Sequence, residues 1–184
     1  MVMYAVLVAF RRDMHTVVML VGQLLNEASS LALKHLVAGS KWRHWSVRPP
    51  GSDKTDAGMP SSHTQFTFFF CTYSALFLWR RVTLERPQAK PLLCLALEFF
   101  ALLVGFSRYH LRYHTAEQVF AGAALGIACG VTWFAVAGTL RPGFAALEQW
   151  GPFKFFHFKD TSHVPFLHRF EKLCSVRARG QKAM

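Results

Sequence analysis

Residues Val119–Leu140 read VFAGAALGIACGVTWFAVAGTL and contain no Asp, Glu, Lys or Arg. A run of this kind is stable in the hydrocarbon of a bilayer or in the interior of a protein, where its backbone groups pair within a helix. Crossing a bilayer takes about 17–25 predominantly apolar residues, and this run falls within that range. The stretch therefore predicts a membrane-spanning helix that dominates the fold of the chain.

Three further stretches carry at most one charged residue each: Thr16–Leu33, Thr64–Trp79 and Leu92–Phe106. The chain of 184 residues is 52% hydrophobic and only 17% charged, which leaves little amphipathic surface to face water. The pattern predicts an all-α, polytopic membrane helix bundle with four clear transmembrane helices. The shorter apolar stretch Met1–Phe10 is expected to form a partial N-terminal helix. Buried core helices of a soluble protein are the alternative.

The formal net charge of +11 is typical of nucleic-acid binding, but its distribution favours a membrane. If the four runs alternate in direction, 14 of the 21 Lys and Arg residues fall on one side, which the positive-inside tendency makes cytoplasmic. We therefore expect a membrane and no nucleic acid as partner. Residues 1–143 are expected to form the membrane-embedded domain. Residues 144–184 are expected to form an interfacial or cytoplasmic basic tail, with the aromatic segment Trp150–Phe158 in the interface.

Small residues inside the apolar runs indicate how the helices pack against one another. Gly122, Gly126 and Gly130 are four residues apart on one helical face. Such spacing lets helix backbones approach closely in a membrane, although membrane helices also tolerate glycine without that role. The four cysteines show no metal-ligand spacing, so we expect reduced packing residues and no metal site.

Two polar loops join these runs, one after Thr16–Leu33 and the other before Val119–Leu140. Two crossings separate the loops, so both emerge on the same face of the membrane. By the charge distribution this face is the lumen or the exterior. Three clusters in the loops mix cations or hydroxyls with histidine, namely Lys41 to Arg48-Pro49, Pro60-Ser61-Ser62-His63, and Ser107-Arg108 with His114.

The residue types in these clusters fit the chemistry of phosphate. Guanidinium groups and hydroxyls match phosphate oxygens, and unpaired amides at a helix start attract anions. Two histidines supply one nitrogen to attack phosphorus and another to protonate the departing oxygen. His114 opens the last helix, whose positive end favours the neutral, nucleophilic imidazole. Taken singly, each cluster is also typical of a helix cap, a structural histidine or a solvated charge run.

Together, in this order and at these spacings, the stretches KWRHWSVRP, PSSH and SRYHLRYHTAEQ resemble the motifs of the type 2 phosphatidic acid phosphatase superfamily. The resemblance implies a membrane phosphatase that uses no metal or cofactor. It makes His114 the nucleophile that forms a phosphohistidine. His63 would be the acid that protonates the leaving group and then activates water. The groups around the phosphate would be Lys41, Arg48, Arg108, Ser61 and the Ser62 amide.

The chain departs from that family's pattern where Ser62 stands for glycine and Gln118 for aspartate. These changes, with LLNE at Leu24–Glu27, GMPSSH, and KDTS at Lys159–Ser162, look like the dolichyldiphosphatase branch. That branch implies hydrolysis of a polyprenyl diphosphate lipid, dolichyl diphosphate, to the monophosphate. The reaction would occur on the lumenal face of the endoplasmic reticulum membrane and recycle the carrier for protein N-glycosylation. The apolar helices would hold the isoprenoid tail.

Two positions in the motifs have alternatives. Gln118 would orient His114 through its amide oxygen, and Glu117, about 100° round the helix, is the other candidate. Lys41 has the motif spacing to Arg48, about two helical turns, which predicts one helical face for the pair. Lys34 stands where the branch places its lysine. The motif spacing favours Lys41.

Two other functions fit the same residues. The chain could be another lipid phosphatase, acting on phosphatidate, a sphingoid phosphate or undecaprenyl diphosphate. Alternatively, it is a non-catalytic membrane protein that binds lipid phosphate, an interpretation motivated by the loss of the carboxylate at Gln118.

Overall fold

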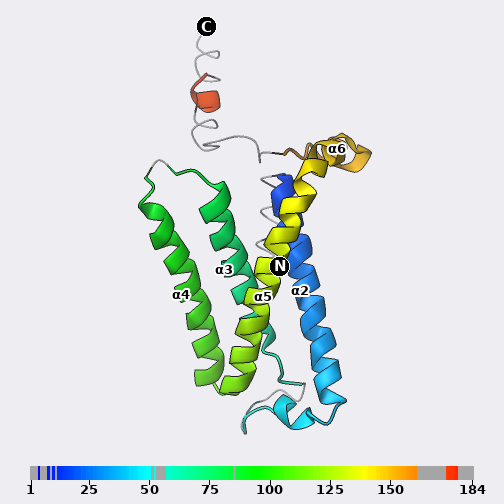
Figure 1. Cartoon of the computed structure of the whole chain (residues 1–184), viewed down its shortest axis with the longest axis vertical. Coiled ribbons are helices and arrows are strands. Elements are labelled where there is room, and N and C mark those ends of the chain that lie inside the picture. The colour runs from blue at the N-terminus through cyan, green and yellow to red at the C-terminus, as the bar shows by residue number, and fades with distance from the viewer. Residues whose placement is uncertain are drawn as a thin grey trace.

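In the part of the chain that the structure describes, four long helices lie side by side in the computed structural model (Figure 1). The structure describes residues 12–50, 57–84, 86–160 and 173–177, together with residues 4, 8, 10 and 52. The long helices are α2 (Met14–Ala38), α3 (Ser62–Arg81), α4 (Ala89–His110) and α5 (Ala116–Leu140). Shorter elements are η1 (Arg43–Ser46), η2 (Arg141–Gly143), α6 (Phe144–Gln149) and α7 (Gly151–Phe155). The described residues contain no β-strand, which confirms the all-helical expectation.

Both ends of the chain fall largely outside the described residues. Of the expected partial helix Met1–Phe10, only Tyr4, Val8 and Phe10 are described. The Tyr4 side chain is buried and its hydroxyl donates to Gln23 Oε1 at 3.2 Å, so Tyr4 contacts α2. Most of the expected basic tail, and the last two residues of KDTS, lie outside the described residues as well.

Among the described residues, three segments are long and apolar enough to cross a membrane: α2, α4, and Ala116–Gln149, which runs from α5 to the end of α6. The expected helix over Thr64–Trp79 also forms, as α3 with 20 residues, but it is not among the three. Its buried side chains include Thr64, Gln65 and Thr72, which are polar without being charged. The expected count of four apolar spans is therefore not confirmed.

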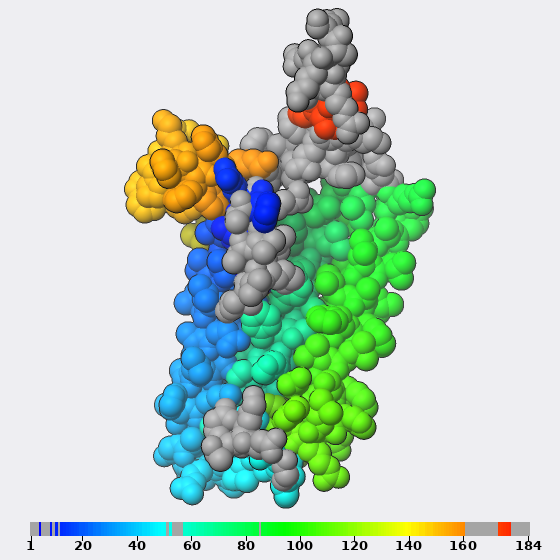
Figure 2. Space-filling model, turned by 180° about the vertical axis from the view of Figure 1, so that it is seen from behind, coloured from blue at the N-terminus to red at the C-terminus, as the bar shows by residue number. Residues whose placement is uncertain are grey.

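α3 contacts α2, α4 and α5 and so lies at the centre of the bundle. α4 lies at its edge and buries only Ala101 and Gly105 (green in Figure 2). Its exposed side chains include Leu95, Phe99 and Leu102. A continuous apolar helix surface is stable against lipid tails, whereas in water it would favour association. The central helix thus buries polar side chains, whereas the edge helix exposes apolar ones, as lipid on the outside requires.

Glycines form the contact between α5 and α3. Gly122, Gly126 and Gly130 are all buried on one face of α5. A Cβ atom added to Gly126 would lie 2.5 Å from the Gln65 carbonyl oxygen, and one added to Gly122 would lie 2.6 Å from the Ser61 carbonyl oxygen. Real Cβ atoms do not approach oxygen so closely. The stripe therefore lets the two backbones touch, which decides between the two interpretations of its spacing.

A buried polar seam joins α2 to α3. The Nε2 atom of Gln65 donates to the Asn26 carbonyl oxygen at 3.1 Å and to Asn26 Oδ1 at 3.0 Å. Near the loops, Ser30 Oγ donates to Ser62 Oγ at 3.1 Å. Hydrogen bonds of this kind are strengthened where water is excluded, so the seam fixes the start of α3 against the middle of α2.

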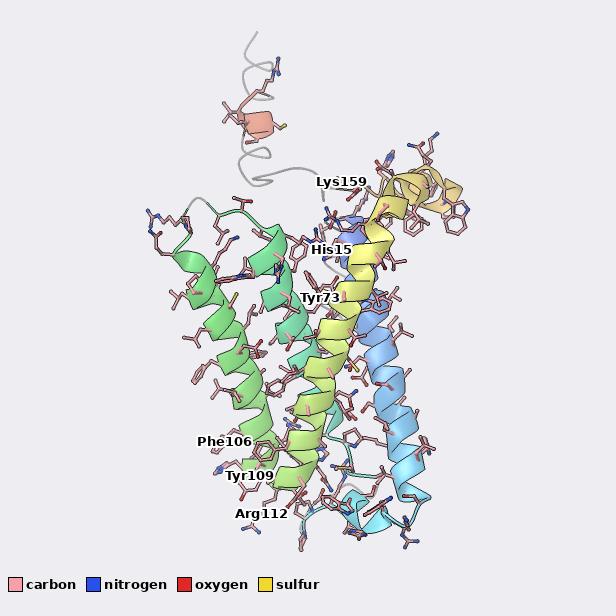
Figure 3. The ribbon with its side chains drawn as sticks, viewed as in Figure 1. His15, Tyr73, Phe106, Tyr109, Arg112 and Lys159 are labelled. Carbon is pink, nitrogen blue, oxygen red and sulfur yellow. The ribbon has the colours of Figure 1, made fainter. Side chains whose placement is uncertain are left out.

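The two ends of the bundle carry different groups (Figure 3). At one end the Tyr73 hydroxyl lies 3.1 Å from His15 Nε2, and Lys159 returns beside them. The Lys159 carbonyl accepts a hydrogen bond from the first amide of α2 at 3.1 Å. Tyr109 and Arg112, which belong to the junction of α4 and α5, lie at the opposite end. The loop after α2 lies at this second end too (Figure 1).

We expect Gly126→Ala to lower the free energy of unfolding by roughly 1–3 kcal/mol, because the added carbon must displace the α3 backbone. Gly138 is the matched control on the same helix, since its nearest neighbour is an Arg81 guanidinium nitrogen at 3.7 Å. Gly138→Ala should be neutral or stabilising by up to about 1 kcal/mol, because alanine is the better helix former. Thermal unfolding in detergent, followed by circular dichroism, measures both. Equal stability of the two variants would contradict the close packing.

Candidate active site

Both polar loops meet at one end of the bundle, where hydrogen bonds join them. Arg48 Nη1 donates to the Tyr113 carbonyl oxygen at 2.8 Å and so links the loop after α2 to the loop after α4. The Gln118 side chain donates to the Trp45 carbonyl oxygen at 2.9 Å. The Ser61 backbone N–H donates to the Gln118 carbonyl oxygen at 3.1 Å. The two loops that the sequence predicts on one side of the membrane therefore meet at one end of the bundle.

The start of α5 has a capping box that sets the geometry around His114. Thr115 Oγ1 accepts a hydrogen bond from the Gln118 backbone N–H at 3.4 Å, and Gln118 Oε1 accepts one from the Thr115 N–H at 3.3 Å. Such a box fixes how the chain enters a helix. It brings the Gln118 amide back toward His114, the residue just before the cap.

The partners of His114 decide its tautomer. Its Nδ1 lies 3.0 Å from the Gly58 carbonyl oxygen and 3.1 Å from Gln118 Oε1, and both of these atoms are acceptors. Its Nε2 lies 3.3 Å from Arg48 Nη1, which can only donate. The proton therefore belongs on Nδ1, and Nε2 keeps its lone pair. This is the nitrogen that a nucleophilic histidine would use.

Burial keeps this ring neutral. The side chain of His114 is 4% exposed. The pKa of His114 is lowered to about 4, mainly by burial and also by the Arg48 charge, while the hydrogen bonds to Gln118 and Gly58 act in the opposite direction. The charge of Lys34 is a further cause that lowers this pKa. A pKa this low favours the neutral form that the sequence predicts, and burial is its main cause.

Arg48 and Arg108 both lie beside the His114 segment. The Arg108 carbonyl oxygen accepts hydrogen bonds from the Tyr113 N–H at 3.1 Å and the His114 N–H at 3.2 Å. Its guanidinium lies 5.3 Å from the centre of the Tyr113 ring. The Arg108 Nε atom is buried and has no hydrogen-bond partner among the described residues. A buried donor of this kind suits an oxygen of a bound phosphate.

The second motif lies at the start of α3. Ser61 is buried and its Oγ lies 3.0 Å from Thr64 Oγ1, while Ser62 accepts a hydrogen bond from Ser30. His63, the second residue of α3, is exposed. Its neighbours Ser61 and Thr64 pack against Gly122 of α5. The backbone that carries His63 is therefore fixed beside the helix start that follows His114.

The first motif differs from its expected shape. α2 ends at Ala38, and only the short η1 element lies between Lys41 and Arg48. The expectation that these two share a helical face is therefore wrong, because the helix is interrupted after Ala38. Lys41 is exposed and its ammonium lies 5.4 Å from the centre of the Trp42 ring. Lys34, on the last turns of α2, is the lysine whose charge acts on His114.

Several groups at the site are backbone atoms that no motif reveals. The carbonyl oxygens of Trp45 and Val47 accept from Gln118 at 2.9 and 2.8 Å, and the Gly58 carbonyl faces His114. Sequence gives no sign of where a carbonyl points. Only Gly58 has a signal in the sequence, because it stands in the GMPSSH stretch. A Cβ atom at this position would lie 2.7 Å from the Gln118 amide, so the structure requires glycine there. Glu117 is exposed, and Gln118 is the residue that contacts the His114 ring.

Residues 15–142, which hold all of these groups, match the family model described as the PAP2 superfamily. The chain belongs to this superfamily. The motif resemblance drawn from the sequence is thereby confirmed. No solved structure matches the chain.

Curated relatives of this PAP2 superfamily member indicate the branch of the superfamily to which it is similar. Dolichyldiphosphatase 1 of Mus musculus is 35% identical over 179 residues, which cover 91% of this chain and 72% of that protein. Dolichyldiphosphatase 1 of Dictyostelium discoideum is 34% identical over 168 residues, covering 90% and 72%. Lipid phosphate phosphatase gamma of Arabidopsis thaliana is 40% identical over 116 residues, covering 62% and 51%. The similarity to dolichyldiphosphatases confirms the branch indicated by the motifs.

Histidine ¹⁵N NMR of the labelled protein in detergent tests the state of this ring. We expect the proton on Nδ1 and a titration near pH 4, so that the ring gains its second proton only as the pH falls through that value. Arg48→Gln should raise the pKa of His114, because it removes a positive charge beside Nε2. Arg43→Gln, an exposed charge change in the same loop, should leave it unchanged. A proton on Nε2 at neutral pH would contradict the assigned tautomer.

Proposed function

We propose that this protein hydrolyses dolichyl diphosphate to dolichyl phosphate and inorganic phosphate. Two kinds of support agree. The relatives that match over about nine tenths of the chain are dolichyldiphosphatases by name. The observation that carries the chemistry is the His114 ring, which is neutral and buried, with the Nε2 lone pair 3.3 Å from the Arg48 guanidinium.

The proposed reaction has two steps. His114 Nε2 attacks the terminal phosphorus, a P–N bond forms, and the bond from phosphorus to the bridging oxygen breaks. His63 donates a proton to that oxygen, and dolichyl phosphate leaves. His63 then takes a proton from water as the water attacks the phosphohistidine, which releases inorganic phosphate and restores His114.

The cations stabilise the charge that develops on the transferred phosphoryl oxygens. Arg48 and Arg108 are proposed to hold these oxygens, with Ser61 and the Ser62 amide as further donors. The reaction is proposed to need no metal or cofactor, because guanidinium groups and N–H donors supply the electrostatic stabilisation. Gln118 orients the ring but cannot offset a positive charge on it. A phosphate monoester is a better leaving group than an alkoxide, so a diphosphate substrate suits this weaker support.

The membrane placement is also a proposal. α2, α3, α4 and α5 would form four spans, and residues near the N-terminus part of a fifth. Residues 1–143 would form the embedded domain and residues 144–184 a cytoplasmic tail. α6 lies near the end of the bundle opposite the site (Figure 1). Trp150, which directly follows α6, and Phe155 are exposed, which suits a segment lying in the interface. The site would face the lumen of the endoplasmic reticulum, where the reaction returns the lipid carrier for N-glycosylation.

A second lipid-phosphate substrate is favoured by one relative, the Arabidopsis thaliana protein named lipid phosphate phosphatase gamma. Turnover of phosphatidate, a sphingoid phosphate and undecaprenyl diphosphate beside dolichyl diphosphate compares the candidates. We expect dolichyl diphosphate to react fastest. A phosphatidate rate well above it would overturn the proposed substrate.

We expect the purified protein to release phosphate from dolichyl diphosphate in the presence of EDTA. His63→Gln should lower the rate by roughly 10²–10⁴-fold, as loss of a general acid does, and His114→Gln should abolish turnover. An alkaline denaturing quench should trap a phosphohistidine in the wild type and none in His114→Gln. Lipid binding without phosphate release would instead support the non-catalytic alternative.

The lysine near the phosphate is tested by comparing Lys34→Ala with Lys41→Ala. Motif spacing supports Lys41, whereas the effect of the Lys34 charge on His114 supports Lys34. We expect Lys34→Ala to lower kcat/KM by about 10–100-fold, the usual effect of losing one charge-assisted hydrogen bond. Lys41→Ala should change it by less than about threefold, because exposed charges contribute little. The reverse order of effects would restore Lys41 as the motif lysine.

A further inference from the structure

The amide of Gln118 has more partners than the orientation of His114 requires. The side chain is 1% exposed. Its Oε1 faces His114 Nδ1 at 3.1 Å and the Thr115 N–H at 3.3 Å. Its Nε2 donates to the carbonyl oxygens of Trp45 at 2.9 Å and Val47 at 2.8 Å. A primary amide has two N–H donors and two acceptor lone pairs, so the hydrogen-bonding capacity of Gln118 is fully used.

The two donated bonds explain why an amide stands here and a carboxylate does not. An ionised carboxylate accepts hydrogen bonds but donates none. At position 118 it would place a buried oxygen 2.8–2.9 Å from the carbonyl oxygens of Trp45 and Val47, with no donor between the three acceptors. A buried charge that faces acceptors with no donor between them is strongly unfavourable. The conformation of the loop at Trp45 and Val47 therefore depends on a donor-bearing side chain at position 118.

The segment that Gln118 holds is the one that carries Arg48. Val47 directly precedes Arg48, whose Nη1 reaches the Tyr113 carbonyl oxygen and His114 Nε2. One amide thus contacts the nucleophile through its oxygen and the backbone next to the arginine through its nitrogen. We infer that Gln118 is a positioning residue that fixes the Arg48 guanidinium beside His114, in addition to orienting the ring. This inference rests on the proposed function, in which Arg48 binds the phosphate.

Gly58 packs directly on this amide and supports the same arrangement. Its N–H donates to the Ser46 carbonyl oxygen at 2.8 Å, and its own carbonyl faces His114 Nδ1 at 3.0 Å. A Cβ atom on Gly58 would lie 2.7 Å from both Nε2 and Oε1 of Gln118. The amide is therefore enclosed between the Gly58 segment and the loop at Trp45, which leaves it one position.

An orienting role and a positioning role predict different kinetics. A residue that only orients His114 acts on the chemical step and on the pKa of the ring. A residue that also places Arg48 acts on the binding of the phosphate, and its effect disappears when Arg48 is absent. A double-mutant cycle separates these cases, because substitutions that act through the same contact are not additive.

The cycle uses Gln118→Glu, which keeps the shape and removes both donors, with Arg48→Gln and the double variant. We expect Gln118→Glu to raise KM for dolichyl diphosphate by about tenfold or more, since two backbone hydrogen bonds are lost. In the Arg48→Gln background the same change should alter KM by less than about threefold. Glu117→Gln, an exposed charge change at the next position, is the matched control and should leave KM within about twofold. Additive effects on KM would overturn the inference.

Hydrogen exchange provides a readout that does not need activity. In the wild type the Gly58 N–H and the segment from Trp45 to Arg48 should be protected, and Gln118→Glu should speed their exchange while the α3–α5 contact stays protected. Gln118→Met, which is neutral, should do the same if the charged variant does not fold. Unchanged exchange in the loop would overturn the inference. If the wild type hydrolyses no lipid phosphate, the proposed function fails, and the exchange measurement alone decides whether Gln118 holds the loop.

Discussion

The site depends on the direct contact between the backbones of α3 and α5. Gly122 stands one helical turn after Gln118, and it faces the Ser61 carbonyl oxygen at a distance that leaves no space for a side chain. Because the backbones touch, the two helices begin side by side, and the Ser61 N–H can reach the Gln118 carbonyl oxygen. A side chain at the contact would separate the helix starts and, with them, the segments that carry His63 and His114.

The electrostatics of the site follow from where His114 is buried. Burial and the Arg48 charge both disfavour a protonated ring, so Nε2 stays available over a wide pH range. The same guanidinium suits the oxygens of a phosphate. Attraction for the substrate and activation of the nucleophile therefore come from one arrangement of charge. A carboxylate in place of the Gln118 amide would oppose this by favouring the imidazolium, whereas the amide fixes the tautomer without adding charge.

Much of the fold could be predicted from the sequence because apolar runs bounded by polar loops leave few alternatives. The runs at Thr16–Leu33 and Leu92–Phe106 lie within α2 and α4. α3 is harder to classify from sequence, because it lacks charge over Thr64–Trp79 although Thr64, Gln65 and Thr72 are polar and buried. The contacts of Gln118 with carbonyl oxygens could not be predicted, because every residue has a carbonyl and its direction is set only by the fold.

The polarity of α3 has a structural consequence of its own. Apolar side chains pack almost equally well at several rotations of a helix in a membrane, whereas hydrogen bonds select one. Gln65 pairs with Asn26 on α2, and the carbonyl oxygens of Ser61 and Gln65 face the glycines of α5, so only one rotation satisfies both neighbours. That rotation also decides where the first turn of α3 presents His63. The polar residues that make α3 a poor membrane span by composition are thus the ones that orient it, and its place at the centre of the bundle keeps them away from lipid.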